Sequence, residues 1–346
     1  MNERENLLRA VEFRYPEWIP CSVALMPATW KKYGRALEDI VERYPELFRY
    51  QKTSAEEHAT FGPGYCEGEY FTDNWGCVWY NVQGGLEGQV VDHPLEDWNG
   101  LATWQPPDPL VEDDRGLQDW DEACARLQEA KAEGWIAIGG LPHGFLFMRL
   151  FYLRGFENLM IDLVTDPPEL RELIQILLDH NMALVKKWIE LGVEVLSAGE
   201  DLGGQDRLLM TPKYFRKYIR PCYKELFGTT REAGCHVYLH SDGHILEIID
   251  DLIECGVTIL NPQIRANTLD GLVEACKGRI CINLDLDRQF FPFATPAELR
   301  EHIEEAVVKL GSAEGGLMLH AECEPDVPLE NIEAICETLT AFRTYY

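Results

Sequence analysis

Several side chains that can hold metal ions or move protons follow short apolar segments in the second half of the sequence. Glu200 and Asp201 follow VEVLSAG, His240 ends CHVYLH with Asp242 two positions later, and Cys323 follows GLMLH. Imidazole, thiolate and carboxylate groups are the ligands that Zn2+ takes in proteins, and a catalytic zinc keeps three protein ligands and one open position. Glu200, His240, Asp242 and Cys323 are therefore candidate metal ligands.

The same residues also have simpler structural explanations. His240 can form a hydrogen bond within the fold, and Asp242 can cap a helix that begins near His244, because helix starts favour Asp, Asn and Ser. His320 and Cys323 could instead form a base and a nucleophile, although the sequence shows no third group to orient them. Residue types alone leave these alternatives open.

Five more residues at or just beyond the ends of apolar segments are candidates for substrate binding. They are His143, Phe145, Phe147, Asn261 and Gln263. Small-molecule pockets combine apolar and aromatic walls with a few polar groups, which is the mixture found here.

The spacing of apolar residues predicts the elements that position these side chains. From residue 135 onward, short apolar strands alternate with amphipathic helices, as in parallel βα units. We expect strands at 19–25, 135–140, 193–199, 235–240, 257–262, 279–284 and 316–320, and helices at 168–191, 212–233, 244–255, 268–277, 296–310 and 328–344. One further strand would complete a (β/α)8 TIM barrel, whose active site forms at the carboxyl ends of its strands. An open doubly wound sheet is the alternative, but no glycine-rich phosphate loop follows any strand.

The N-terminal third is predicted to hold an excursion within a single domain that spans residues 1–346. Residues 65–95 contain short aromatic and β-branched runs separated by glycines, which is typical of antiparallel hairpins. The proline-rich, acidic stretch at 99–115 predicts a loop that leads to a helix at 116–133. The excursion therefore covers residues 65–115, after a first helix at 4–14.

The composition excludes some partners. The chain has 31 Lys and Arg against 59 Asp and Glu, a net charge of −28, which repels nucleic acid and anionic membranes. The sequence shows neither a secretory signal pattern nor an apolar run of about 18 residues, so we expect a cytoplasmic protein without a membrane span. The 11 cysteines are then expected to be reduced thiols.

Five segments, in order, give the chain a family resemblance. They are LLRAVEFRYPEWIP, TDNWGCVWYNVQGGLEGQVVDHPLEDW, AGEDLGGQ, YLHSDGHILEIIDDLIECGVTILNPQ and GGLMLHAECEPDVPLENI. With them the chain resembles the uroporphyrinogen decarboxylase superfamily, and within it the corrinoid-dependent methyltransferase-like branch, whose fold is a (β/α)8 barrel. True decarboxylases carry an Arg-Gln-Ala-Gly-Arg segment after the first strand to hold the carboxylates of their substrate. This chain has LMPATWKKYG there, so the resemblance does not extend to decarboxylation of a uroporphyrinogen.

The methyltransferase-like branch binds zinc through a His-x-Cys pair at one strand end and a cysteine before a Pro-x-Glu-Asn helix start. Here the matching residues are His240-Ser241-Asp242 and Cys323, ahead of PLEN. The resemblance thus implies His240 and Cys323 as zinc ligands, Asp242 in place of the first cysteine, and Glu200 or Asp201 as a further ligand. It implies methyl transfer between a small methylated substrate, such as a methyl ether, and cobalamin supplied by a separate corrinoid protein. His240, Asp201 and Asp242 are the expected catalytic residues.

Two other functions compete with methyl transfer. One is a metal-free decarboxylase or lyase of the same fold, with Asp201 or Asp242 as proton donor. The other is a barrel that binds a small molecule without catalysis. Metal analysis separates the first from a zinc enzyme, and replacement of His240 would spare ligand binding in the second.

Overall fold

The computed structural model describes residues 1–49, 53–62 and 64–343, and it has an α/β fold. A parallel sheet of seven strands runs in the order β1-β10-β9-β8-β7-β6-β5. Its strands are β1 (Cys21–Leu25), β5 (Ile138–His143), β6 (Val195–Asp201), β7 (His236–Asp242), β8 (Ile259–Pro262), β9 (Cys281–Asp285) and β10 (Leu317–Cys323). All seven predicted strands are confirmed. The further strand that would complete a (β/α)8 barrel is absent from this sheet in the described part of the chain.

The strands end later than their apolar runs. β5, β6, β7 and β10 extend two or three residues beyond the predicted ends, so that His143, Asp201, Asp242 and Cys323 are the last residues of strands rather than the first residues of loops. A strand continues as long as its backbone groups pair with a neighbour, whatever the polarity of its side chains. Each of these residues therefore has a defined side of the sheet.

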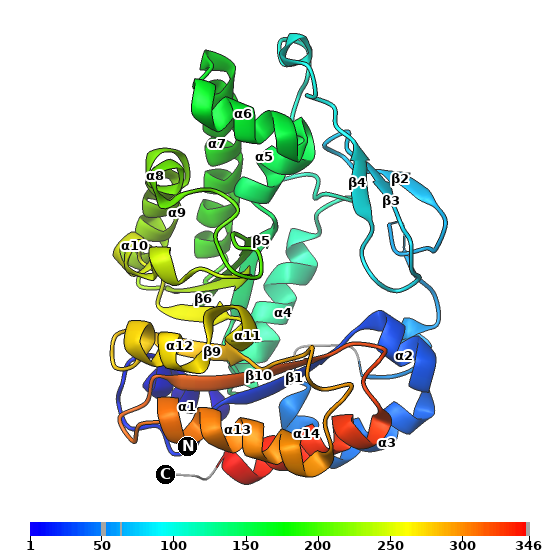
Figure 1. Cartoon of the computed structure of the whole chain (residues 1–346), viewed down its shortest axis with the longest axis vertical. Helices are drawn as coiled ribbons and strands as arrows, with labels where there is room; N and C mark the ends of the chain where they lie inside the picture. Colours follow the sequence, from blue (N-terminus) through cyan, green and yellow to red (C-terminus); the bar gives the residue numbers. More distant parts are fainter. Residues whose placement is uncertain (50–52, 63, 344–346) are drawn as a thin grey trace. The chain divides into compact units, whose positions relative to one another are not determined.

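The chain folds into two compact units, each assembled from segments distant in the sequence. One unit, called here the central unit, comprises Tyr70–Tyr80 and Gln89–Leu260. In it β5, β6 and β7 pair in parallel, and α7 packs on β5 and on α9 (Figure 1). Its longer helices are α4 (Trp120–Ala132), α5 (Phe147–Arg154), α6 (Phe156–Thr165), α7 (Pro168–Glu190), α9 (Arg220–Glu232) and α10 (Ile249–Cys255). Its short helical turns are η3 (Trp98–Gly100), α8 (Pro212–Tyr214), η4 (Phe215–Ile219) and η5 (Leu246–Ile248).

The central unit also contains the predicted hairpins. β2 (Tyr70–Thr72), β3 (Val78–Tyr80) and β4 (Gln89–Asp92) form a separate antiparallel sheet, drawn in cyan in Figure 1. Gly76, between β2 and β3, and Asn81, Gly84 and Gly85, between β3 and β4, supply the turns that such short strands need. The predicted hairpin excursion is confirmed as a small three-stranded sheet.

The other unit, called here the terminal unit, comprises the described parts of Met1–Glu69, Asn81–Gly88 and Asn261–Tyr346. β10 pairs in parallel with β1 and β9, and α13 packs against α14. The helices are α1 (Glu3–Val11), α2 (Pro27–Tyr33), α3 (Arg35–Arg43), α11 (Ile264–Asn267), α12 (Leu269–Cys276), α13 (Pro296–Leu310) and α14 (Leu329–Phe342), with turns η1 (Pro45–Leu47) and η2 (Glu56–His58).

The predicted helices are confirmed, with α13 matching its predicted bounds because a Thr295–Glu298 capping box fixes its start. Residue 344, in the predicted helix 328–344, lies outside the described residues. Helices α2, α3, α5 and α6 were not predicted, although α3 carries Leu37, Ile40 and Val41 at helical spacing and could have been identified from the sequence. Among the described residues, no helix is long and apolar enough to span a bilayer.

Candidate metal centre

Two histidines and an aspartate meet at the carboxyl ends of β5, β6 and β7. Parallel pairing sets His143 opposite Gly199 and Gly199 opposite His240, with Asp201 opposite Asp242. Alternate residues of a strand lie on the same side of a sheet, so Asp201 shares a side with Gly199, and Asp242 shares one with His240. One ligand atom from each of His143, Asp201 and His240 lies within 4.8 Å of the others.

The cluster is open to solvent and tied together by short contacts. Nε2 of His143 lies 3.5 Å from Oδ1 of Asp201, and Nε2 of His240 lies 3.1 Å from Oδ1 of Asp242. The exposed fractions of these four side chains are 45%, 34%, 23% and 29%. Burial lowers the pKa of His143, but the hydrogen bond to Asp201 and the negative charge of that carboxylate outweigh it, so the pKa is raised overall. The site therefore favours positive charge at its centre.

A glycine makes room for one of the imidazoles. A Cβ atom on Gly199 would lie 2.7 Å from Cδ2 of His143, which is closer than real Cβ contacts allow. The missing side chain at Gly199 lets the His143 ring lie across β6 towards β7, where the two imidazole centroids are 6.0 Å apart. Gly199 is therefore part of the architecture that brings the two histidines together.

Glu200 lies on the opposite side of β6 from Asp201. Its side chain is fully buried, and its carboxylate accepts hydrogen bonds from the backbone N–H groups of Leu146 (2.5 Å), Phe147 (2.9 Å) and Met148 (2.8 Å). These groups open α5, whose N-cap Leu146 has no side chain that can accept such bonds. Burial raises the pKa of Glu200 to about 7, although the three donors act to lower it. The structure thus uses Glu200 as the cap of α5.

Cys323 belongs to the terminal unit and is also directed away from the polar side of its strand. Along β10, His320 and Glu322 are partly exposed, whereas Ala321 and Cys323 are fully buried. Burial raises the pKa of the Cys323 thiol well above its usual range. The carbonyl of Cys323 accepts a hydrogen bond from Thr29 Oγ1 at 2.8 Å, which joins β10 to α2.

The predicted aromatic substrate contacts need correction. Phe145 is 2% exposed and stacks on Tyr223 of α9 at 5.4 Å between ring centroids, and Phe147 is fully buried. Both rings fill the space between sheet and helices, where apolar burial is most stabilising, and neither offers surface to a ligand. The third predicted contact in this unit, His143, is instead a member of the metal cluster.

Asn261 and Gln263 lie in the terminal unit. The side-chain amide of Asn261 donates to the carbonyl of Asn283 at 2.6 Å, and Gln263 forms a parallel bridge with Asp285. The carbonyl of Gln263 also accepts from the side chain of Asn267. Both residues thus hold β8 and its following turn to β9 and α11.

The donor chemistry of the cluster fits a metal ion. Two imidazole nitrogens and one carboxylate oxygen are a set that catalytic zinc uses, and the same set also suits Fe2+. Sequence reasoning identified His240, Asp201 and Asp242 but assigned His143 to the substrate. The position of His143 at a strand end, beside a strand whose facing residue is glycine, is the signal that could have identified it as a ligand.

Comparisons with known proteins place the chain in a family. The sequence profile described as "Uroporphyrinogen decarboxylase (URO-D)" matches residues 80–342. A methyltransferase from Methanosarcina mazei is similar in structure, with a TM-score of 0.63, 17% identity and 99% of each chain covered. A B12-independent methionine synthase from Shewanella sp. W3-18-1 superposes more loosely, with a TM-score of 0.43, 11% identity, and 68% of this chain and 70% of that one covered.

No curated protein matches the sequence. The likeness to the Methanosarcina protein concerns the fold, because only 17% of the residues are identical. The family profile is the stronger observation, since it follows the sequence itself and includes β5, β6 and β7 with the metal cluster. The chain belongs to the uroporphyrinogen decarboxylase family.

Proposed function

We propose that the protein is a zinc-dependent methyltransferase that moves a methyl group between a small methylated substrate, such as a methyl ether, and a corrinoid protein that supplies cobalamin. The observation that carries the proposal is the His143, Asp201 and His240 cluster, whose ligand atoms lie within 4.8 Å of one another. A bound zinc ion would supply Lewis acidity to the atom that the methyl group leaves. The fold of a methyltransferase from Methanosarcina mazei, which covers the whole chain, supports the reaction class.

Each residue of the cluster has a separate task in this proposal. His143, Asp201 and His240 would hold the ion, which leaves a position open for substrate. Asp242, 3.1 Å from Nε2 of His240, restrains that imidazole and can instead supply an oxygen as a fourth ligand atom. Met148 accepts the backbone N–H of Asp201 through its sulfur at 3.1 Å, which fixes the strand end that presents the carboxylate.

The ligand set favours a particular kind of methyl donor. Thiolate ligands are absent from the His143, Asp201 and His240 set, and nitrogen and oxygen ligands make a harder metal site. Such a site suits activation of a methyl group bound to oxygen or nitrogen better than binding of a thiol acceptor. We therefore expect methyl ethers or methylamines to be the donors.

A metal-free decarboxylase or lyase is the second candidate, and one contact favours it. The His143 and Asp201 side chains lie 3.5 Å apart at an exposed site, so a proton can pass between them on its way to a substrate carbon. Asp201 or Asp242 would be the proton donor. This reaction needs no ion.

Metal analysis followed by a spectral assay tests the two candidates. Purified protein, depleted with a chelator and reloaded with Zn2+ or Fe2+, is assayed for bound metal and for conversion of cob(I)alamin to methylcobalamin with a panel of methyl ethers and methylamines. About one zinc per chain and a methylcobalamin spectrum are expected. Failure to bind metal, with no spectral change for any donor, would reject the proposal and favour the metal-free candidate.

Substitutions distinguish two possible sets of metal ligands. The structure brings together His143, Asp201 and His240, whereas the family resemblance implies His240, Asp242 and Cys323. His143→Ala and Asp201→Asn should lower zinc content well below one per chain, whereas Cys323→Ala, which replaces a buried thiol with a small apolar group, should retain it. His240→Ala should lose zinc under either set and is the positive control. A folded Cys323→Ala protein without zinc would show that the thiol is a ligand.

The proposal includes two features of the whole protein. We infer that the seven-stranded sheet is the wall of a (β/α)8-type barrel, in which the carboxyl ends of the strands carry the active site. We also infer a cytoplasmic location, where the corrinoid partner and reduced cysteines would be found.

A further inference from the structure

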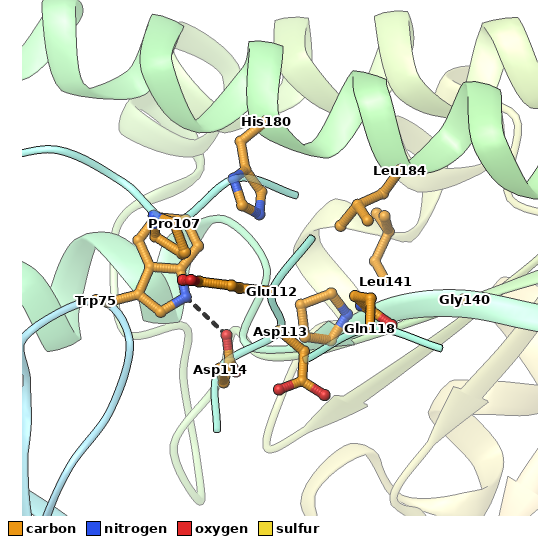
Figure 2. Close-up of a pocket in the computed structure, with 11 residues that line it drawn as sticks. Trp75, Pro107, Glu112, Asp113, Asp114, Gln118, Gly140, Leu141, His180 and Leu184 are labelled. Carbon is orange, nitrogen blue, oxygen red and sulfur yellow. Dashed lines mark hydrogen bonds between the residues drawn. The ribbon is translucent and has the colours of Figure 1, made fainter. Parts of the chain in front are cut away.

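A cavity of about 210 Å3 lies in the central unit (Figure 2). It is enclosed by Gly140, Leu141 and Pro142 of β5, by α7, and by the acidic loop before α4. None of His143, Asp201 and His240 lines it. It is smaller than the roughly 300–1,000 Å3 of pockets for drug-sized ligands, so it suits a molecule of a few heavy atoms.

The cavity is lined by three consecutive acids and by neither Lys nor Arg. Two of the acids are already engaged. Asp114 accepts from Trp75 Nε1 and Arg149 Nη2, each at 2.7 Å, and Asp113 accepts from the backbone N–H groups of Arg115 and Gly116.

The third acid, Glu112, is half-buried and points into the cavity in Figure 2. Among the described residues, no hydrogen bond or ion pair is formed by its carboxylate. Arg149 balances the charge of Asp114, but the Glu112 carboxylate remains as a negative charge at the cavity, and a cation is its complementary ligand.

His180 of α7 provides an independent sign of a missing ligand. Its imidazole points into the cavity in Figure 2, the residue is 8% exposed, and its Nδ1 atom has no hydrogen-bond partner in the described part of the chain. Burial, followed by the positive charge of Arg149, lowers the pKa of His180 to about 4, so the ring is neutral at physiological pH. A neutral imidazole has one nitrogen that accepts a hydrogen bond, and leaving a buried polar atom unmatched is unfavourable.

The remaining wall is apolar. Leu141 from β5 and Leu184 from α7 face the acids across the cavity, and the Trp75 ring closes one side (Figure 2). An inorganic cation gains nothing from such a wall, whereas an alkyl group is stabilised by removal from water. The wall therefore selects an organic cation.

We propose that this cavity binds a small protonated alkylamine, whose ammonium group pairs with Glu112 and donates a hydrogen bond to His180 while its alkyl part contacts Leu141 and Leu184. The site lies on the helix-covered side of β5 and is separate from the metal cluster. The proposal therefore stands or falls independently of methyl transfer.

Calorimetric titration of the full chain tests the proposal with four probes at 150 mM NaCl, where weak attraction to surface acids is screened. The probes are trimethylammonium, n-propylammonium, tetramethylammonium, which lacks an N–H donor, and tert-butanol, a neutral molecule shaped like trimethylammonium. We expect saturable one-to-one binding of the first two, weaker binding of tetramethylammonium, and none of tert-butanol. Equal binding of tert-butanol and trimethylammonium would overturn the proposal.

Three variants locate the binding. Glu112→Gln should weaken trimethylammonium binding about tenfold or more, since it removes the negative charge that pairs with the ammonium group and leaves only a neutral acceptor oxygen. Leu184→Phe should weaken it by filling the cavity, and it serves if Glu112→Gln fails to fold. Glu129→Gln, at an exposed acid of α4, is the matched control and should bind as the original protein does. Unchanged binding in either cavity variant, or an equal loss in the control, would contradict the proposed site.

Discussion

Glu200 and Asp201 are adjacent acids on opposite sides of β6, and their amide variants should have opposite effects. In Glu200→Gln, the side-chain oxygen can keep the hydrogen bonds from Leu146 and Phe147 that Oε1 accepts at 2.5 and 2.9 Å. The new amide NH2 group then faces the N–H of Met148, which the Glu200 Oε2 atom accepts at 2.8 Å. Two hydrogen-bond donors, the new amide group and the Met148 N–H, would then face each other where the side chain is fully buried.

The size of the effect follows from these contacts. An unsatisfied buried donor costs roughly 1–3 kcal/mol. Loss of the negative charge adds nothing to this cost, because burial already disfavours the charged form of Glu200 in the folded protein. We therefore expect Glu200→Gln to lower the free energy of unfolding by no more than about 1–3 kcal/mol. Asp201→Asn, at a side chain that is 34% exposed, should change it by less than about 1 kcal/mol.

The assay combines urea unfolding with metal analysis. Unfolding is measured at pH 8 on protein freed of metal, so that Glu200 is ionised and bound zinc does not add to stability. An unchanged denaturant slope ensures that the midpoints report stability. Zinc content is then measured on reloaded protein, where Glu200→Gln should retain zinc and Asp201→Asn should lose it. A stable Glu200→Gln protein that has lost zinc would refute the assignment of both residues.

Three further predictions concern the central unit. Gly199→Ala should displace the His143 ring and weaken zinc binding about tenfold or more, as measured by competition with a chelating dye, and wild-type affinity would disprove the role of the glycine. Asp162→Ala leaves Arg154, which is 4% exposed and bonded to Asp162 at 2.9 Å, as an unpaired buried charge, so urea unfolding should show a loss of about 3–5 kcal/mol. The pKa of His180 is lowered to about 4 from an ordinary 6.5, so the folded protein resists protonation of this ring while the unfolded chain accepts it. Stability relative to His180→Asn should therefore be constant above pH 6.5 and fall by up to about 1.4 kcal/mol per pH unit towards pH 4, and parallel pH profiles would contradict this.

The sequence by itself determined the order and type of the main elements. Apolar runs separated by amphipathic helices identified the seven parallel strands, because burial of both faces of a parallel sheet requires such runs. Glycine-separated aromatic runs identified the antiparallel excursion. Reading the strand ends also placed His240 and Asp201 at the carboxyl end of the sheet, where the structure has them, since polar residues after a buried strand must lie near its carboxyl end.

The tertiary structure decided which side of the sheet each residue faces. β6 ends at Asp201 rather than at Gly199, so the two acids become part of the strand and point in opposite directions. A sequence gives residue order, but the side is set by strand register, and a shift of one residue exchanges the two faces. Glu200 therefore caps α5 while Asp201 joins the metal cluster.

The place of His143 likewise depended on tertiary structure. His143 and His240 are almost a hundred residues apart, and only the pairing of β5, β6 and β7 brings them together across Gly199. Cys323 shows the reverse case, because its position in β10 puts it on the buried side with Ala321, away from His320 and Glu322. Residue chemistry named the possible ligands, and the register of the strands decided which of them lie close together.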